Sequence, residues 1–108
     1  MATFDFAVQV DVRFWLSQEK TSTSPSLTKV YRPGQKFPAV FLPAVGDHLE
    51  VTSGFCTEVI SRTVGTDYVL VGTCGGPLSD APMWDQGLKT NRSLQQAIVD
   101  SLRAVGFR

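Results

Sequence analysis

The chain has 108 residues, of which 43% are hydrophobic, and its ten basic and ten acidic side chains give a formal net charge of zero. A chain of this length has room for one core, so residues 1–108 are expected to form a single domain. The balanced charge argues against duplex nucleic acid as a partner, because binding to phosphates requires a basic patch.

Targeting signals are absent from the sequence pattern. No basic-then-apolar segment precedes a small-residue cleavage site, and no apolar run approaches the roughly 20 residues needed to span a bilayer. We therefore expect a cytoplasmic protein with no membrane partner. Cys56 and Cys74 are too few for a disulfide scaffold, so we interpret them as buried reduced thiols; a hairpin folded about Gly65 would nevertheless place them almost opposite each other.

The N-terminal stretch alternates in polarity. Every even-numbered residue from Phe4 to Leu16 is apolar, and most odd-numbered residues are polar. This period of two predicts a half-buried β-strand. Thirteen residues at about 3.3 Å each would make an unusually long strand, so we expect it to bend at a bulge. Trp15 interrupts the polar face and is either a ligand or partner contact or a ring covered by residues 17–26.

The middle of the chain contains short strand candidates separated by turns. Leu27–Arg32 predicts a short strand that carries Tyr31, and His48–Val51 predicts another. Between them, Phe37–Pro43 is apolar but bracketed by prolines, which lack the N–H that a central strand must donate. We expect this stretch to be an edge strand or an extended segment that packs under the sheet.

A β-hairpin is predicted after these strands. Phe55–Thr63 and Asp67–Thr73 are rich in β-branched and aromatic residues, and Gly65-Thr66 between them fits a type II′ turn with glycine at positive φ. Tyr68–Val71 is apolar at every position, which indicates burial on both faces or an interface on one.

The segment Cys74–Asn91 is rich in glycine and proline and shows no periodicity. Irregular connections of this length are uncommon in compact domains and are often functional. Met83, Trp84 and Asp85 are its candidate contacts for a ligand or partner, the alternative being that Trp84 anchors the loop to the core.

The C-terminus predicts an amphipathic helix. Ser93 is the expected N-cap, with Gln96 completing a capping box. Gly106 suits the left-handed position that follows a helix, and Phe107 can then fold back on Leu102. The apolar face of this helix consists of Leu94, Ile98, Leu102 and Val105.

Together these elements predict an α+β fold. About five to six strands form a sheet near 20 Å wide, whereas one helix is about 10 Å across and cannot cover it. The sheet must therefore curl, or a second subunit must cover the remaining apolar surface. We predict a strongly curved, mainly antiparallel sheet or partial barrel with one C-terminal helix, and a homodimer is one way to cover what the helix leaves exposed.

Catalytic patterns are weak. His48 is the only histidine; Asp47 and Glu50 lie near it in the sequence, but no second titratable partner is placed by spacing. An enzyme that uses His48 with the acids Asp11, Glu58 or Asp85 is the second hypothesis. A nucleophilic pair of His48 with Cys56 lacks any surrounding signature.

Cofactor and metal patterns are likewise missing. One histidine and two distant cysteines match no zinc spacing, and the glycine-rich stretch 72–76 lacks the Lys-Ser/Thr of a phosphate loop. No metal, cofactor or catalytic residue is therefore assigned.

The sequence thus favours a small binding or interaction domain that does no chemistry itself and holds a small molecule or protein near the 74–91 loop and the cleft between helix and sheet. A third hypothesis is single-stranded nucleic-acid binding with aromatic rings stacking on an open sheet face, which the neutral charge disfavours. The candidate contact residues are Trp15, Tyr31, His48, Arg62, Tyr68, Met83, Trp84 and Asp85.

Overall fold

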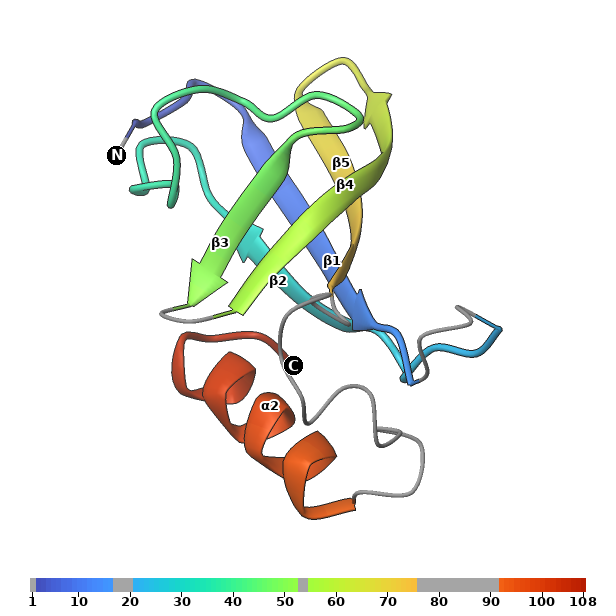
Figure 1. Cartoon of the computed structure of the whole chain (residues 1–108). Helices are drawn as coiled ribbons and strands as arrows, with labels where there is room; N and C mark the ends of the chain where they lie inside the picture. Colours follow the sequence, from blue (N-terminus) through green and yellow to red (C-terminus); the bar gives the residue numbers. More distant parts are fainter. Residues whose placement is uncertain (1, 17–20, 53–54, 76–91) are drawn as a thin grey trace.

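The structure is a computed structural model that describes residues 2–16, 21–52, 55–75 and 92–108. Within these residues the chain forms a sheet of five strands, curled into a half-barrel, and one C-terminal helix, which confirms the predicted α+β architecture (Figure 1). The elements are β1 (Ala7–Phe14), β2 (Leu27–Tyr31), β3 (His48–Thr52), β4 (Phe55–Val64), β5 (Tyr68–Gly75) and α2 (Arg92–Ala104).

The sheet has the strand order β2-β1-β5-β4-β3. Three of its four pairings are antiparallel, as predicted, but β1 and β5 run parallel, with Ala7 opposite Tyr68 and Phe14 opposite Gly75. The first and last of the described strands therefore lie side by side in the interior of the sheet (Figure 1).

Strand β1 forms the centre of the core. The predicted alternation is confirmed here, because Val8, Val10, Val12 and Phe14 are at most 2% exposed. The predicted extent was wrong: the strand is shorter than the stretch 4–16. The residues before Ala7 lie outside the strand, and Ala2 forms an isolated bridge with Phe37.

Strand β4 contains a bulge that the sequence did not reveal. Val59 lies opposite Thr73 and Ser61 opposite Gly72, so Ile60 has no partner in β5. The extra residue shifts the inward and outward pattern of the strand by one. Beyond the bulge, Arg62 is therefore turned toward the concave side of the sheet.

The turn between β4 and β5 differs from the predicted type II′ turn. The Gly65 N–H donates to the Tyr68 carbonyl at 2.8 Å, so Thr66 and Asp67 form the tip of the hairpin. Gly65 does not have positive φ. The absence of a side chain at Gly65 instead leaves room for the Tyr68 ring, because a β-carbon there would collide with it.

The cysteines are not placed opposite each other, contrary to the alignment expected from the hairpin. Cys74 lies opposite Glu58 in the β4–β5 pairing, and Cys56 lies opposite Glu50 in the β3–β4 pairing. Cys56 is half-buried and Cys74 is buried.

The proline-bracketed segment forms no strand; it packs only part of its apolar side chains under the sheet. Phe37 is completely buried, and Ala39 and Leu42 pack against the core. Val40 and Phe41, in contrast, are exposed to solvent.

Helix α2 begins at Arg92, so Ser93 is within the helix and is not its N-cap as predicted. The C-terminus matches the prediction. Gly106 has φ of 103°, its N–H donates to the Arg103 carbonyl at 3.0 Å, and the Phe107 N–H donates to the Leu102 carbonyl at 3.0 Å. These two bonds constitute a Schellman motif.

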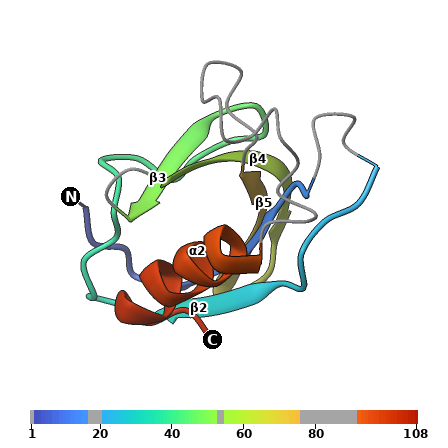
Figure 2. The same ribbon diagram turned by 60° about the horizontal axis from the view of Figure 1, so that its bottom comes forward.

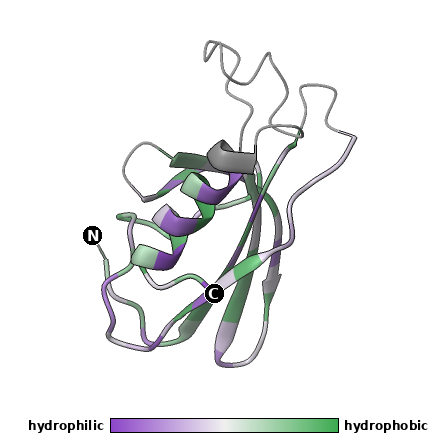
Figure 3. Cartoon of the chain, turned by 90° about the horizontal axis from the view of Figure 1, so that it is seen from below, coloured by the Kyte–Doolittle hydropathy of each residue, from purple (hydrophilic) through white to green (hydrophobic). Residues whose placement is uncertain are grey.

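The helix lies across one end of the half-barrel (Figure 2). Its hydrophobic and hydrophilic residues alternate along the ribbon (Figure 3), and Leu102 and the following Phe107 are fully buried. Its C-terminal end is attached to β2: Lys29 Nζ donates to the Val105 carbonyl at 2.6 Å, and Arg108 exchanges two backbone hydrogen bonds with Thr28. The curled sheet and the helix together enclose the core, as the size argument required.

Candidate functional site

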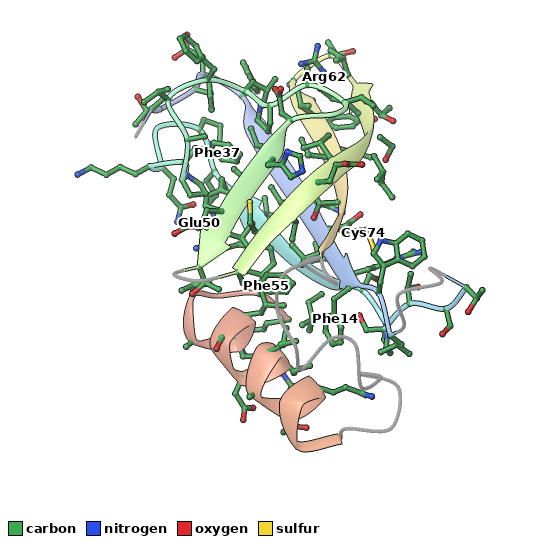
Figure 4. All side chains as sticks on the ribbon, in the orientation of Figure 1. Phe14, Phe37, Glu50, Phe55, Arg62 and Cys74 are labelled. Atoms are coloured by element: carbon green, nitrogen blue, oxygen red, sulfur yellow. The ribbon has the colours of Figure 1, made fainter. Side chains whose placement is uncertain are left out.

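A cavity of about 590 Å³ lies between α2 and the adjoining end of the sheet. We call it the α2 cleft. The sheet contributes the end of β1, the segment that precedes β2 and the start of β2; Figure 4 shows Phe14 at this end, next to the helix. Its lining residues are Phe14, Leu16, Ser24, Pro25, Leu27, Gln95, Gln96, Val99 and Arg103.

The floor of the α2 cleft is apolar and fixed. Phe14 is buried and contacts Phe55 edge to face, with ring centroids 6.4 Å apart. Ser24, although polar, is satisfied by the protein itself: its hydroxyl accepts from the Phe14 N–H and donates to the Pro25 carbonyl, both at 3.1 Å. This hydroxyl therefore holds the wall in place.

The polar groups that remain for a ligand come from α2. Arg103 lies in the last turn of the helix and is exposed. The ion pair found in the described part of the chain joins His48 to Glu58, so no carboxylate there neutralises Arg103. Gln96 donates its amide N–H to Asp100 at 2.8 Å, which leaves its carbonyl oxygen as an acceptor. The α2 cleft thus combines an apolar interior with a cation and an amide on its helical wall.

A second pocket, of about 360 Å³, lies at the opposite end of the half-barrel. We call it the mouth pocket. Figure 4 shows Arg62 at this end, away from α2, and its Nη1 donates to the Pro43 carbonyl at 3.5 Å. The lining residues are Phe6, Leu42, Arg62, Val64, Gly65, Thr66, Tyr68 and Val69.

Two of the candidate residues predicted from the sequence meet in the mouth pocket, Arg62 and Tyr68. His48 does not join them. It is exposed on the edge strand β3, with its Nε2 3.8 Å from Glu58 Oε1, and it lines neither pocket. An exposed pair of this kind contributes little stability and lacks the water-excluding surroundings of a catalytic base.

Tyr31 belongs to the core. It is 5% exposed and contacts Phe37, and Lys29 Nζ lies 4.6 Å from the centre of its ring. Burial raises the pKa of the Tyr31 hydroxyl, because the phenolate loses its hydration. This buried ring cannot stack on a base, so Tyr31 cannot belong to the exposed stacking face that single-stranded nucleic-acid binding requires.

Trp15 lies just beyond β1 and is half-buried. Its backbone forms a bridge with Thr23, and its backbone N–H donates to the Gly75 carbonyl at 2.9 Å. Met83, Trp84 and Asp85 lie outside the described residues. Within the described ranges, no group of three or more His, Cys, Asp or Glu side chains could hold a metal ion.

The residues that the sequence analysis missed are those that complete the two pockets. Val99 and Arg103 are four positions apart on α2 and so share a face, next to the apolar stripe. This spacing was a usable signal for the α2 cleft. Phe6 and Leu42 come from separate segments that meet only in the folded chain, and no local pattern links them to Arg62.

Comparison with protein-family models, curated proteins and solved structures finds no match to this chain. Among the described residues, no helix has the length and apolar character needed to cross a membrane.

Proposed function

We propose that this protein is a small cytoplasmic binding domain without catalytic activity, and that it holds an amphiphilic small molecule in the α2 cleft. The observation that carries the proposal is the cavity of about 590 Å³ with an apolar floor and, on its wall, a guanidinium that pairs with no carboxylate of the described residues. Ligand sites in proteins are typically concave, mostly apolar and equipped with a few polar groups that orient the ligand.

The lining defines the class of ligand. Phe14, Leu27 and Val99 offer apolar contact, whereas Arg103 offers a positive charge that no described carboxylate neutralises. A molecule with an apolar body and a single carboxylate satisfies both features, because the guanidinium fork matches a carboxylate.

Described residues on either side of the segment predicted to hold the ligand lie at this cleft. Gly75 at the end of β5 is paired with the cleft residue Phe14, and Gln95, soon after the start of α2, lines the cleft. The proposal therefore retains Met83, Trp84 and Asp85 as candidate ligand contacts.

The test is a titration of the labelled protein with dodecanoate and, separately, with dodecanol, followed by two-dimensional NMR. We expect saturable shifts at the amides of Phe14, Leu27 and Val99 with both probes. Val99→Phe should fill the cleft and abolish them, whereas Val30→Phe, the same substitution at an exposed position of β2, should not. Absence of saturable shifts with either probe would refute the proposal.

Arg103 is tested separately. Arg103→Gln should weaken the binding of dodecanoate about five- to tenfold and leave the binding of dodecanol unchanged, since a partly exposed charge pair contributes about 1 kcal/mol. Arg32→Gln is the matched control, because Arg32 is exposed and lies outside the cleft. If the variant lost the same affinity for both probes, Arg103 would contribute packing contacts and no charge interaction with the carboxylate.

The second hypothesis, an enzyme using His48, receives no support from the position of this side chain on the exposed face of β3. Turnover in a broad hydrolase panel that His48→Ala abolishes would restore it.

A further inference from the structure

Exposed apolar side chains line or adjoin the mouth pocket. Among the described residues, the large hydrophobic side chains that are exposed are Val30, Val40, Phe41, Val45, Ile60, Val64 and Tyr68. Phe41 is 78% and Val64 66% exposed. Contiguous exposed apolar surface on a soluble domain marks an interaction site, whereas scattered single residues do not. The mouth pocket joins two of the exposed residues, Val64 and Tyr68, with the half-buried Phe6 and Leu42, and Phe41 is adjacent to Leu42.

The bulge in β4 creates this surface. Because Ile60 is the extra residue, Arg62 and Val64 lie opposite the buried residues Val71 and Val69 and turn toward the same side of the sheet. They are nevertheless exposed, since α2 covers only the other end of the half-barrel. The fold thus turns Val64 inward at a place where no described segment of the chain covers it.

Two opposite charges accompany the apolar residues. Arg62 uses one N–H for the Pro43 carbonyl, and its other donors have no partner in the described part of the chain. Asp67 is exposed at the tip of the same hairpin, and its carboxylate forms no ion pair with a described residue. Arg62 lines the mouth pocket, and Asp67 lies in the chain between Thr66 and Tyr68, which both line it. The surface therefore carries a cation and an anion beside its apolar residues.

We propose that a second copy of this chain docks on this surface to form a symmetric homodimer. In a two-fold arrangement each contact occurs twice, so Arg62 of one protomer can pair with Asp67 of the other in both directions. The formal net charge of zero means that two copies do not repel each other. Tyrosine, phenylalanine and arginine are also enriched at the centre of protein interfaces.

The proposal is independent of ligand binding in the α2 cleft, which lies at the other end of the half-barrel and stays accessible in the dimer. The proposals of ligand binding and of dimerisation can therefore be refuted independently of each other.

Sedimentation velocity of the full chain from micromolar to millimolar concentration tests the proposal. We expect a reversible monomer–dimer equilibrium. Phe41→Ser should weaken it by about tenfold or more, because the residue is largely exposed in the monomer and loses apolar burial only in the dimer. Val30→Ser, at the exposed apolar position outside the surface, is the control and should leave the equilibrium unchanged.

A charge exchange then tests the geometry. Arg62→Asp and Asp67→Arg should each shift the protein toward monomer, and the double variant carrying both changes should restore the dimer at low salt. Circular dichroism of each variant shows that the fold is retained. A wild-type chain that stays monomeric at millimolar concentration, or that binds only a different protein here, overturns the proposal. A dimer that Phe41→Ser leaves intact, or a folded double variant that is not restored, overturns it as well.

Discussion

The ring of Phe55 lies against the α-carbon of Gly75: a β-carbon at position 75 would be 2.6 Å from Cζ of the ring and 3.0 Å from Cγ2 of Thr57. Both Phe55 and Thr57 are buried, so neither can move aside freely. The strand β5 therefore needs glycine at the point where it passes the aromatic pair of Phe55 and Phe14.

Gly75→Ala is accordingly expected to destabilise the domain by about 1–3 kcal/mol through overpacking. Gly72→Ala is the matched control in the same strand, where the added methyl group meets only the hydroxyl of Ser61, an exposed side chain that can rotate. Urea denaturation of both variants measures the difference in the free energy of unfolding. Equal losses of stability would show that the Phe55 ring can move to accommodate the added methyl group.

The C-terminal turn of α2 offers a second test. Gly106→Ala forces a side chain into a backbone with φ of 103° and places its β-carbon 3.2 Å from Cε of Lys29. We expect a loss of about 1–2 kcal/mol in the free energy of unfolding. Gly34→Ala has a similarly positive φ but meets nothing within 4 Å, so its smaller loss reports the backbone cost alone. A larger loss for Gly34→Ala would contradict the role assigned to Lys29.

The core of β1 is tested by a pair of identical substitutions on neighbouring strands. Val10→Ala removes methyl groups from a fully buried site and should cost about 2–3 kcal/mol, whereas Val30→Ala changes a residue that is 49% exposed and should cost less than about 0.5 kcal/mol. Thermal and urea unfolding measure both. Similar losses would mean that the face of the sheet occupied by Val10 had been assigned incorrectly.

Burial of Tyr31 predicts a dependence of stability on alkaline pH. The pKa of its hydroxyl is raised in the folded state, so above about pH 10 the unfolded chain loses a proton that the folded chain still holds. The free energy of unfolding therefore falls as the pH rises from about 10 to the folded pKa and is unaffected below that range. Tyr31→Phe should flatten this part of the profile relative to wild type, as measured by urea denaturation at a series of alkaline pH values. An unchanged slope would refute the effect.

Local patterns predicted much of this fold. The alternation in β1 and the Gly106–Phe107 helix end depend on neighbours in sequence, and both appear in the structure. The parallel pairing of β1 with β5 could not be inferred, because no local signal specifies which distant strand becomes a neighbour. The bulge at Ile60 was equally invisible, since an extra residue in a strand leaves no compositional mark.

The candidate site was also predicted only in part, because local patterns identify residue types and not the distant segments that pack beside them. The aromatic and arginine character of Tyr68 and Arg62 marked them as contact residues, and the structure places them in one pocket. Arg103 was not among the predicted contact residues, because the cleft beside it depends on how α2 sits against the sheet. Tyr31 was assigned to binding although its ring lies in the core, which its place in a short strand did not disclose.

The pairing of Ala7 with Tyr68 also determines when this chain can fold. Strand β1 is synthesised before its neighbours and finds β2 nearby, but a two-stranded hairpin is marginally stable in water. Its other neighbour, β5, is synthesised only after β2, β3 and β4, so the central pairing depends on closing a long loop. Chains dominated by such distant contacts fold in milliseconds to seconds. During synthesis the apolar face of β1 therefore remains uncovered, and nascent chains that stop before β5 are the ones expected to aggregate or to require a chaperone.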